Sequence, residues 1–201
     1  MATRGRGRPR AAEGRDLRAE LLRVSRQVLD EGGPALLSLR EVARRADCTH
    51  QAPYHHFPNR EALLAALVAE GFDQLAAMLR RARVEAEGDV LEASANAYVE
   101  FALRNPGVFR VMFRVDVCDP KRYPEVQASG GLAREELRLV VAADGAAGGD
   151  LAESACWAHV HGLATLLLDG PLGLEHVTLD QRLSHAGRVN RALRRPEERV
   201  E

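Results

Sequence analysis

The sequence predicts an all-α protein, in which an N-terminal helix-turn-helix unit of three short helices precedes a larger helical domain. Ala, Leu, Arg and Glu, which favour helix, dominate the 201 residues. Apolar residues recur at steps of three and four through most of the chain, and no alternating strand pattern, internal repeat or phosphate-binding loop interrupts them. The predicted divisions are a basic arm over 1–13, the helix-turn-helix unit over 14–60 and the larger domain over 61–201.

The first predicted helix spans Arg15–Asp30, and Gly32-Gly33-Pro34 ends it. Ser38-Leu39-Arg40-Glu41 has the pattern of a capping box and therefore opens a second helix of barely two turns. Asp47-Cys48 forms a tight connection. Thr49 caps a third short helix that runs through His55.

Asn59 is expected to cap a long fourth helix, which carries one apolar stripe. Asp89–Arg104 forms the next helix, and Asn105-Pro106 ends it and starts another. A loop over 115–124 leads into a helix over Pro124–Ala143. Leu151–Asp169 is a strongly apolar helix. Thr178-Leu179-Asp180-Gln181 is another capping box and opens the last helix, whose seam includes Leu179, Leu183, Ala186 and Leu193.

The charge is segregated along the chain although the net charge is only −1. Residues 1–60 hold 12 Arg against 7 Asp and Glu, whereas the remainder holds 16 basic and 22 acidic residues. Residues 1–10 contain four Arg and no acid. This pattern indicates a polyanionic partner for the first third of the chain.

Signals for membrane or secretion are weak in this sequence. The N-terminus is basic but lacks an apolar core segment, and no apolar run reaches membrane-spanning length. The three cysteines, Cys48, Cys118 and Cys156, share no metal-ligand spacing and leave an odd thiol. We therefore expect a cytoplasmic protein, without a membrane partner, in a reducing compartment.

Three histidines, His50, His55 and His56, lie close together before the fourth helix and raise the possibility of a metal or catalytic site. Their spacings of five and six do not match the three or four residues that bring side chains together on one helical face. Cys48 is the only suitably spaced partner, and it is expected to fill the small core of the turn. The sequence thus predicts no metal ion, no cofactor and no catalytic residue here.

The same segment suits a short DNA-recognition helix. Gln51 can pair with adenine edges, His50 can donate to guanine and Ala52 can contact a thymine methyl group. Phe57 and His56 are expected to pack inward as the floor of the small domain. The remaining predicted DNA-binding residues position the unit on phosphates and at the start of the second helix: Ser38, Thr49, Tyr54, His55 and Arg60.

Residues 20–67 resemble the TetR family of bacterial repressors. The resemblance rests on the capped SLREVARRA and on YHHFPNREALL from Tyr54 to Leu64, which is similar to the family's YxHFxxKexLl signature. Two positions differ: the turn reads Asp47-Cys48-Thr49 instead of Gly-Val-Ser, and Arg60 replaces the usual lysine. Arg still serves a phosphate, and Asp tolerates a left-handed backbone better than most residues.

A second resemblance lies downstream. Tyr98–Ala102, Asn105–Phe109 and the segment Trp157-Ala158-His159-Val160-His161-Gly162 resemble the C-terminal domain type named for its Trp-His-Gly motif. This resemblance implies a ligand-binding and dimerisation domain over 61–201.

The basic arm contains Arg6-Gly7-Arg8-Pro9, which is similar to the core of an AT-hook. An extended Arg-Gly-Arg can lie in a narrow A·T minor groove. The alternative is a solvated tail, in which Arg6 and Arg8 add only nonspecific attraction.

The second half of the chain also suggests a ligand cavity. Trp157, His161, Thr165 and Leu168 share one face of their helix. We expect aromatic and apolar side chains from the two preceding helices to converge on this face and line a pocket for a small molecule. The alternative is ordinary core with a satisfied histidine. The converging residues are Tyr98, Phe101, Phe109, Met112 and Phe113.

A different face of the same helix carries small residues, Ala155, Ala158 and Gly162. Because Gly inside a helix costs about 1 kcal/mol relative to Ala, close approach of another helix would offset this cost. Together with Leu183, Ala186 and Leu193 of the last helix, this stripe predicts a two-fold dimer built as a four-helix bundle.

These observations predict a homodimeric DNA-binding transcriptional regulator. Its partners would be a palindromic double-stranded operator and a small apolar or amphipathic effector, whose binding releases the repressor from DNA. The alternatives are an architectural A·T-tract binder without an effector, or a small helical enzyme that uses its histidines. The enzyme interpretation lacks a nucleophile–base set at readable spacing.

Overall fold

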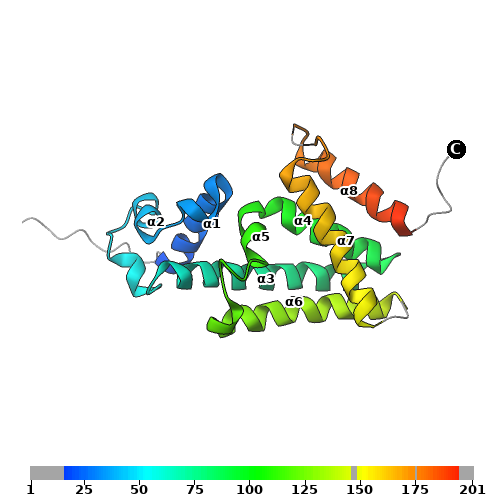
Figure 1. Ribbon diagram of the computed structural model, residues 1–201, viewed down its shortest axis with the longest axis horizontal. Helices are drawn as coiled ribbons and strands as arrows, with labels where there is room; N and C mark the ends of the chain where they lie inside the picture. Colours follow the sequence, from blue (N-terminus) through cyan, green and yellow to red (C-terminus); the bar gives the residue numbers. More distant parts are fainter. Residues whose placement is uncertain (1–15, 146–148, 175, 195–201) are drawn as a thin grey trace, which may run out of the picture.

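The computed structural model describes residues 16–145, 149–174 and 176–194. Within these residues it consists of helices and turns without a strand, which confirms the predicted all-α fold. Helix α3 (Arg60–Glu85) runs through the molecule and joins its two parts (Figure 1). Helices α1 (Leu17–Leu36) and α2 (Leu39–Arg45) and the short 3₁₀ helix η1 (Ala52–His55) lie at one end of α3.

The capping signals predicted for the N-terminal part are largely confirmed. Ser38 accepts a hydrogen bond from the Glu41 backbone N–H at 3.1 Å, and Asn59 accepts one from the Ala62 N–H at 2.8 Å. Thr49 does not cap the third helix as expected. That segment is a turn followed by the 3₁₀ helix η1, whose N-cap is Gln51 and which has no side-chain cap.

Helix α1 continues to Leu36, six residues beyond its predicted end, but it is kinked at Gly32 and Gly33. Gly33 has a φ of 67°, a left-handed conformation that glycine adopts without steric cost. The glycine pair thus redirects the chain, and a short helical turn follows it before α2 begins.

Asp47, at the end of α2, occupies the position where the family usually has glycine. Its φ of 50° is the only positive φ of a non-glycine residue in the part of the chain that the structure describes. The side chain is exposed, so the left-handed conformation meets no packing constraint. The predicted tolerance of Asp at this turn is therefore confirmed.

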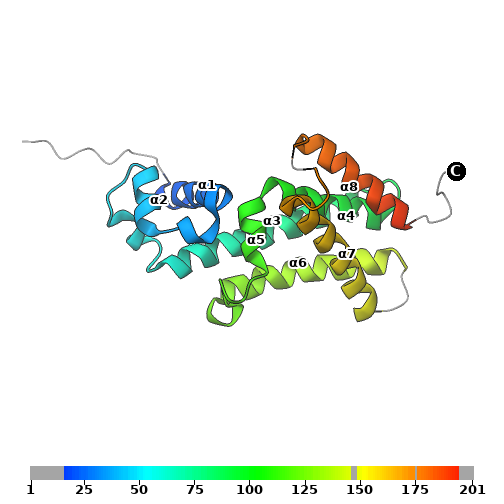
Figure 2. The ribbon, with the colours of Figure 1, turned by 45° about the horizontal axis from the view of Figure 1, so that its top comes forward.

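The C-terminal part follows the predicted order of helices. Helix α4 spans Val90–Arg104, and α5 (Pro106–Met112) begins directly after Asn105. After η2 (Pro120–Arg122) come α6 (Pro124–Ala143), α7 (Asp150–Asp169) and α8 (Leu179–Arg194). Figure 2 shows α7 crossing between α6 and the pair formed by α4 and α8.

Helix α3 is the centre of the core, packed against α6 on one side and α4 on another. By length and composition it could cross a membrane, but 56% of its most apolar window is buried inside the protein. Its apolar character is explained by contacts with neighbouring helices. In its predicted apolar stripe, Phe72 is half-buried. The other six residues of the stripe are buried: Leu63, Leu64, Leu67, Val68, Leu75 and Leu79.

Short helix α5 lies between the two parts of the molecule and packs on both α1 and α3. A Cβ at Gly71 of α3 would lie 2.7 Å from Cγ1 of Val108 and 2.8 Å from Sδ of Met112. Glycine at this position therefore permits close approach of α5 to α3.

Candidate DNA-binding face and effector cavities

The predicted recognition segment lies on the surface of the N-terminal part. Thr49, His50, Gln51 and His55 are exposed, and the Tyr54 side chain is 47% exposed. A hollow in this face is lined by His50, Gln51, Tyr54 and Arg40. Arg40, in the first turn of α2, was not among the predicted DNA-binding residues, and its exposed guanidinium adds a positive charge to this hollow.

Two other predicted members of this face have structural roles. Ser38 is the N-cap of α2. Arg60 donates a hydrogen bond from Nε to the Leu37 carbonyl oxygen at 2.8 Å and another from its terminal nitrogen to the Pro34 carbonyl oxygen. The guanidinium thus satisfies carbonyl groups at the kinked end of α1 and fixes the approach to α2. A contact between Arg60 and a DNA phosphate would therefore use the N–H groups of the guanidinium that remain.

The inward packing predicted for the end of this segment is half right. Phe57 is buried, with 3% of its surface exposed, but His56 is exposed. The 3₁₀ geometry of η1 explains the difference, because its rotation per residue differs from that of an α-helix. Ala52 is half-buried. Arg6 and Arg8 lie outside the described residues.

The aromatic residues predicted to converge in the C-terminal part form one cluster around His161. Its ring centroid lies 4.8 Å from that of Phe113 and 5.2 Å from that of Phe109. Trp157 is 5.8 Å from Phe113, and Tyr98 is 5.9 Å from Phe109. Helices α4, α5 and α7 therefore meet at these side chains.

A chain of hydrogen bonds orders the polar atoms of this cluster. Trp157 donates from Nε1 to the Tyr98 hydroxyl at 3.3 Å, and the same hydroxyl lies 3.0 Å from Nδ1 of His161. Burial raises the pKa of Tyr98 and lowers the pKa of His161, so both groups are uncharged near neutral pH. The Tyr98 hydroxyl and Nδ1 of a neutral His161 share a hydrogen bond whose direction depends on the tautomer of the ring. This is the satisfied histidine that the alternative interpretation expected.

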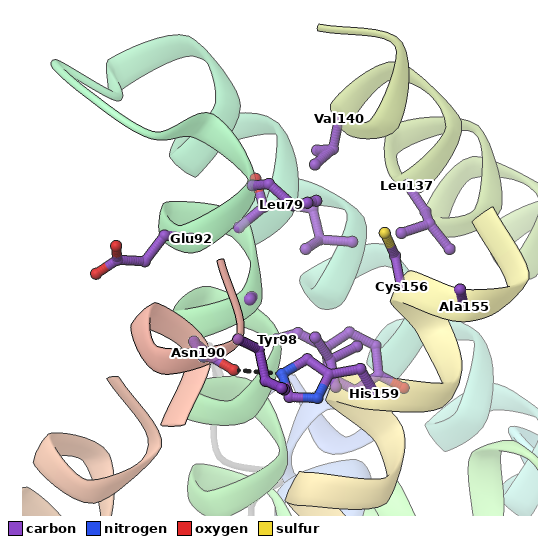
Figure 3. Close-up of a pocket in the computed structure, with 14 residues that line it drawn as sticks. Leu79, Glu92, Tyr98, Leu137, Val140, Ala155, Cys156, His159 and Asn190 are labelled. Carbon is purple, nitrogen blue, oxygen red and sulfur yellow. Dashed lines mark hydrogen bonds between the residues drawn. The ribbon is translucent and has the colours of Figure 1, made fainter. Parts of the chain in front are cut away.

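Two cavities lie beside this cluster. Cavity A, of about 330 Å³, lies between α3, α4, α6, α7 and α8, is partly open to solvent and is lined mostly by apolar side chains (Figure 3). Cavity B, of about 210 Å³, lies between α3, α6 and the rings of Phe113 and Trp157. Leu79, Tyr98 and Leu137 line both cavities, so Tyr98 stands at the partition between them.

The predicted pocket residues divide into three groups. Tyr98, Phe113 and Trp157 line the cavities. Phe109, His161 and Thr165 line a third hollow, of about 270 Å³, which Phe113 also borders. Phe101 and Met112 are buried in the core and line neither cavity. Helix α6, which supplied no predicted residue, provides one wall of each cavity.

A polar network ties α8 to the rest of the domain at the edge of cavity A. His159 bonds through Nε2 to Oδ1 of Asn190 at 2.8 Å, as Figure 3 shows, and Nδ2 of Asn190 donates to Oδ1 of Asn96 at 2.8 Å. Asn190 is 2% exposed. These contacts link α7, α8 and α4 through one buried amide. Among the described residues, no group of His, Cys, Asp and Glu side chains could hold a metal ion.

The small-residue face of α7 is open in the single chain. Ala155 and Ala158 are exposed, and a Cβ added at Gly162 would meet no atom within 4 Å. Leu151 and Leu166, 81% and 42% exposed, extend the same face. On α8, Leu193 is exposed and Leu183 is half-buried. Ala186, on the helix α8 that packs on α4, is 1% exposed and therefore adds nothing to the exposed surface of α8.

Comparison with known families agrees with this architecture. Residues 21–67 match the family model of bacterial regulatory proteins of the tetR family, and residues 91–188 match a tetracyclin repressor-like C-terminal domain. The two matches span most of the chain. The chain belongs to the TetR family of DNA-binding transcriptional regulators. The C-terminal subtype named for the Trp-His-Gly motif is not confirmed by this match.

Several solved structures share the fold. A protein of unknown function from Rhodococcus sp. RHA1 is 32% identical, with a TM-score of 0.73 over 90% of this chain and 96% of that chain. A tetR-family regulatory protein from Rhodococcus RHA1 is 22% identical, with a TM-score of 0.69 over the same shares. LfrR from Mycobacterium smegmatis, solved in complex with proflavine, is 18% identical, with a TM-score of 0.63 over 88% of this chain and 94% of that chain.

Proposed function

We propose that this TetR-family chain is a cytoplasmic, non-catalytic repressor that binds a palindromic operator as a homodimer and is released by a small apolar or amphipathic molecule. TetR regulators bind DNA and small-molecule ligands and act as dimers. Cavities A and B are lined mostly by apolar side chains, and cavity A has the size of a small-ligand pocket. The complex of LfrR with proflavine supports the same kind of partner here.

The proposal rests on the position of helix α5, which contacts both the effector region and the DNA-binding part. At its C-terminal end, Phe113 packs against Trp157 and lines cavity B. At its N-terminal end, the Gly107 N–H donates to Oδ1 of Asp30 in α1 at 2.8 Å. Tyr98, which lines both cavities, packs on Phe109 of the same helix, with ring centroids 5.9 Å apart. A ligand that displaces the Tyr98 or the Phe113 ring therefore moves a helix that is bonded to α1.

The release mechanism is a shift between two arrangements of the dimer. Movement of α1 changes the spacing of the two recognition segments, which must match successive major grooves to bind a palindrome. A ligand that prefers the arrangement with the wrong spacing by 1–3 kcal/mol weakens operator binding about five- to 150-fold. The exposed face of α7, from Leu151 through Gly162, together with Leu183 and Leu193 of α8, is the surface proposed for the partner chain.

A footprint on DNA from upstream of the protein's own gene tests the proposal. We expect protection of a two-fold symmetric site, because a symmetric dimer reads two half-sites about one helical turn apart. An architectural A·T-tract binder would protect A·T-rich DNA without symmetry. An enzyme would protect no sequence. Either of those two results would overturn the proposed function.

A further inference from the structure

Cavity A contains a buried hydroxyl group that has no partner among the residues that the structure describes. Ser94 of α4 is 3% exposed and lines this cavity, and its Oγ atom makes no hydrogen bond with any described residue. A serine in a helix can donate to the carbonyl group four residues earlier, but Ser94 does not. Because a buried unsatisfied hydroxyl costs about 1–3 kcal/mol, a ligand that bonds to it gains that interaction at little cost.

A second polar atom near this cavity has a defined chemical character. Asn190 uses its amide N–H to reach Asn96, so its Oδ1 accepts from His159, and His159 must carry its proton on Nε2. Nδ1, the other ring nitrogen of His159, makes no hydrogen bond within the described part of the chain. His159 also lines cavity A. The lining of cavity A thus includes one hydroxyl that can donate or accept and one imidazole ring.

The charge around cavity A disfavours an anionic ligand. Among the described residues, Glu92 is the only carboxylate that lines the cavity, and no Lys or Arg lines it. The Glu92 carboxylate is paired with Arg191 at 2.9 Å, and in Figure 3 it points away from Leu79, Leu137 and Cys156. A ligand carboxylate in the apolar part of the cavity would therefore be buried without a cation. Cavity B differs, because the exposed Arg134 lines it.

We infer that the effector is an uncharged amphiphile, with a compact apolar body and a hydroxyl or amide-like group, and that it binds in cavity A with its polar group on Ser94. The effect of this ligand on DNA binding rests on the proposed function, whereas its binding in cavity A does not. The apolar body contacts Leu79, Leu137, Val140 and Val160, and the polar group replaces the hydrogen bond that Ser94 lacks.

Four aromatic probes of one shape test the ligand class. They are para-propylphenol, its methyl isostere para-propyltoluene, the anion para-propylbenzoate and the cation para-propylbenzylammonium. Binding to the full-length protein is measured by calorimetry. We expect the phenol to bind at least about ten-fold more tightly than the benzoate, because the carboxylate loses its hydration without finding a cation. The benzylammonium is expected to bind more weakly than the phenol, since Glu92 already has a cation.

The variant Ser94→Ala tests the anchor. It should weaken the phenol about five-fold and leave the toluene derivative unchanged, because only the phenol bonds to the hydroxyl. The matched control is Ser129→Ala in α6, which removes another buried serine that lines neither cavity. Cys156 reports the location, because it lines cavity A and is half-buried. Bound phenol should slow its alkylation, as mapped by mass spectrometry, more than that of Cys118.

Several results would overturn the inference. These are absence of phenol binding up to its solubility limit, a Ser94→Ala variant that binds the phenol as tightly as wild type, or a benzoate that binds as tightly as the phenol. Benzoate binding that Arg134→Gln abolishes would place the effector in cavity B. Failure of the proposed function is a separate result: the phenol binds cavity A in a Ser94-dependent way, but operator affinity does not change.

Discussion

The Asp30 carboxylate accepts a hydrogen bond from the Gly107 backbone N–H, so the C-terminal part of α1 is bonded to the first turn of α5. The approach is close enough to require glycine. A Cβ at position 107 would lie 2.5 Å from the Leu29 carbonyl carbon and 2.6 Å from the Asp30 nitrogen. An anionic acceptor at a helix N-terminus is favourable, because the orphan N–H groups and the helix dipole both attract negative charge.

Substitutions at this contact should destabilise the protein in a graded way. Gly107→Ala forces α1 and α5 apart and should lower the free energy of unfolding by about 1–3 kcal/mol. Asp30→Ala removes a charge-assisted hydrogen bond and should cost about 1–2 kcal/mol, whereas Asp30→Asn retains an acceptor and should cost less. Urea unfolding measures these changes.

The matched control for this series is Gly131→Ala in α6, where an added Cβ meets no atom within 4 Å. This substitution should stabilise the protein by up to about 1 kcal/mol, because Ala has the higher helix propensity. If Gly107→Ala behaves like Gly131→Ala, the close contact between α1 and α5 does not exist in solution.

Base recognition and phosphate contact should separate on the DNA-binding face. His50→Ala and Gln51→Ala should change preference at particular base pairs by about 1–3 kcal/mol each. Arg40→Ala and Tyr54→Phe should weaken binding to all sequences similarly, and Arg40→Ala should also reduce the salt dependence. Selection of binding sites from random DNA measures both effects. An unchanged selected sequence for His50→Ala and Gln51→Ala would show that this segment does not read the bases.

Much of the fold could be predicted from the sequence because its helix ends carry local signals. For the helix Pro124–Ala143, the proline at its first position and the polar turn after its last position predicted both ends correctly. Gly32-Gly33 indicated a break correctly, but the helical turn after it depends on Arg60, which binds the Pro34 and Leu37 carbonyl groups from a distant position. Such contacts between distant residues leave no periodic pattern in the sequence, so they could not be predicted from it.

The candidate site was predicted less completely. Helical spacing identified the rings that surround His161, since spacing reports which side chains share a face. It did not identify the α6 walls of the cavities, because which helix covers which face is a property of tertiary packing. Asn190 was detectable: it lies four residues after Ala186 and seven after Leu183, on the apolar seam of the last helix, where a buried amide needs partners.

The open face of α7 should support dimerisation. Gly162→Leu adds a bulky side chain to a face that is empty in the single chain, so the monomer should fold while the close approach of a partner helix is blocked. Sedimentation should show loss of the dimer, and operator affinity should fall without ligand. Gly131→Leu, at an equally open position on α6, is the control. Retention of a dimer with full operator affinity in Gly162→Leu would place the interface elsewhere.

Burial of His161 gives stability a defined pH dependence. Burial lowers its pKa from the ordinary value of 6.5, so the unfolded chain binds this proton more readily than the folded protein does. The stabilisation that comes from keeping His161 neutral is present above pH 6.5. It is lost as the pH falls from 6.5 through the pKa of His161 in the folded protein. His161→Gln should therefore flatten the decline of stability on acidification, measured by urea unfolding between about pH 5 and 8.

The exposed His55 provides the comparison for this experiment. His55→Gln should leave the stability profile parallel to that of wild type. A His161→Gln profile that also remains parallel to wild type would show that His161 is not held in its neutral form by burial.

The central claim is that a ligand in the cavities and operator DNA on the recognition face affect each other's binding through α5. Thermodynamic reciprocity between the two binding equilibria tests this claim most directly. The measurement is the dissociation constant of operator DNA with and without saturating para-propylphenol, and that of the phenol, followed by Trp157 fluorescence, with and without operator. We predict that both constants rise by one and the same factor, about five-fold or more. The predicted factor is smaller in Asp30→Ala, which loosens α5 from α1. A phenol that changes Trp157 fluorescence but leaves the operator dissociation constant unaltered would contradict the claim.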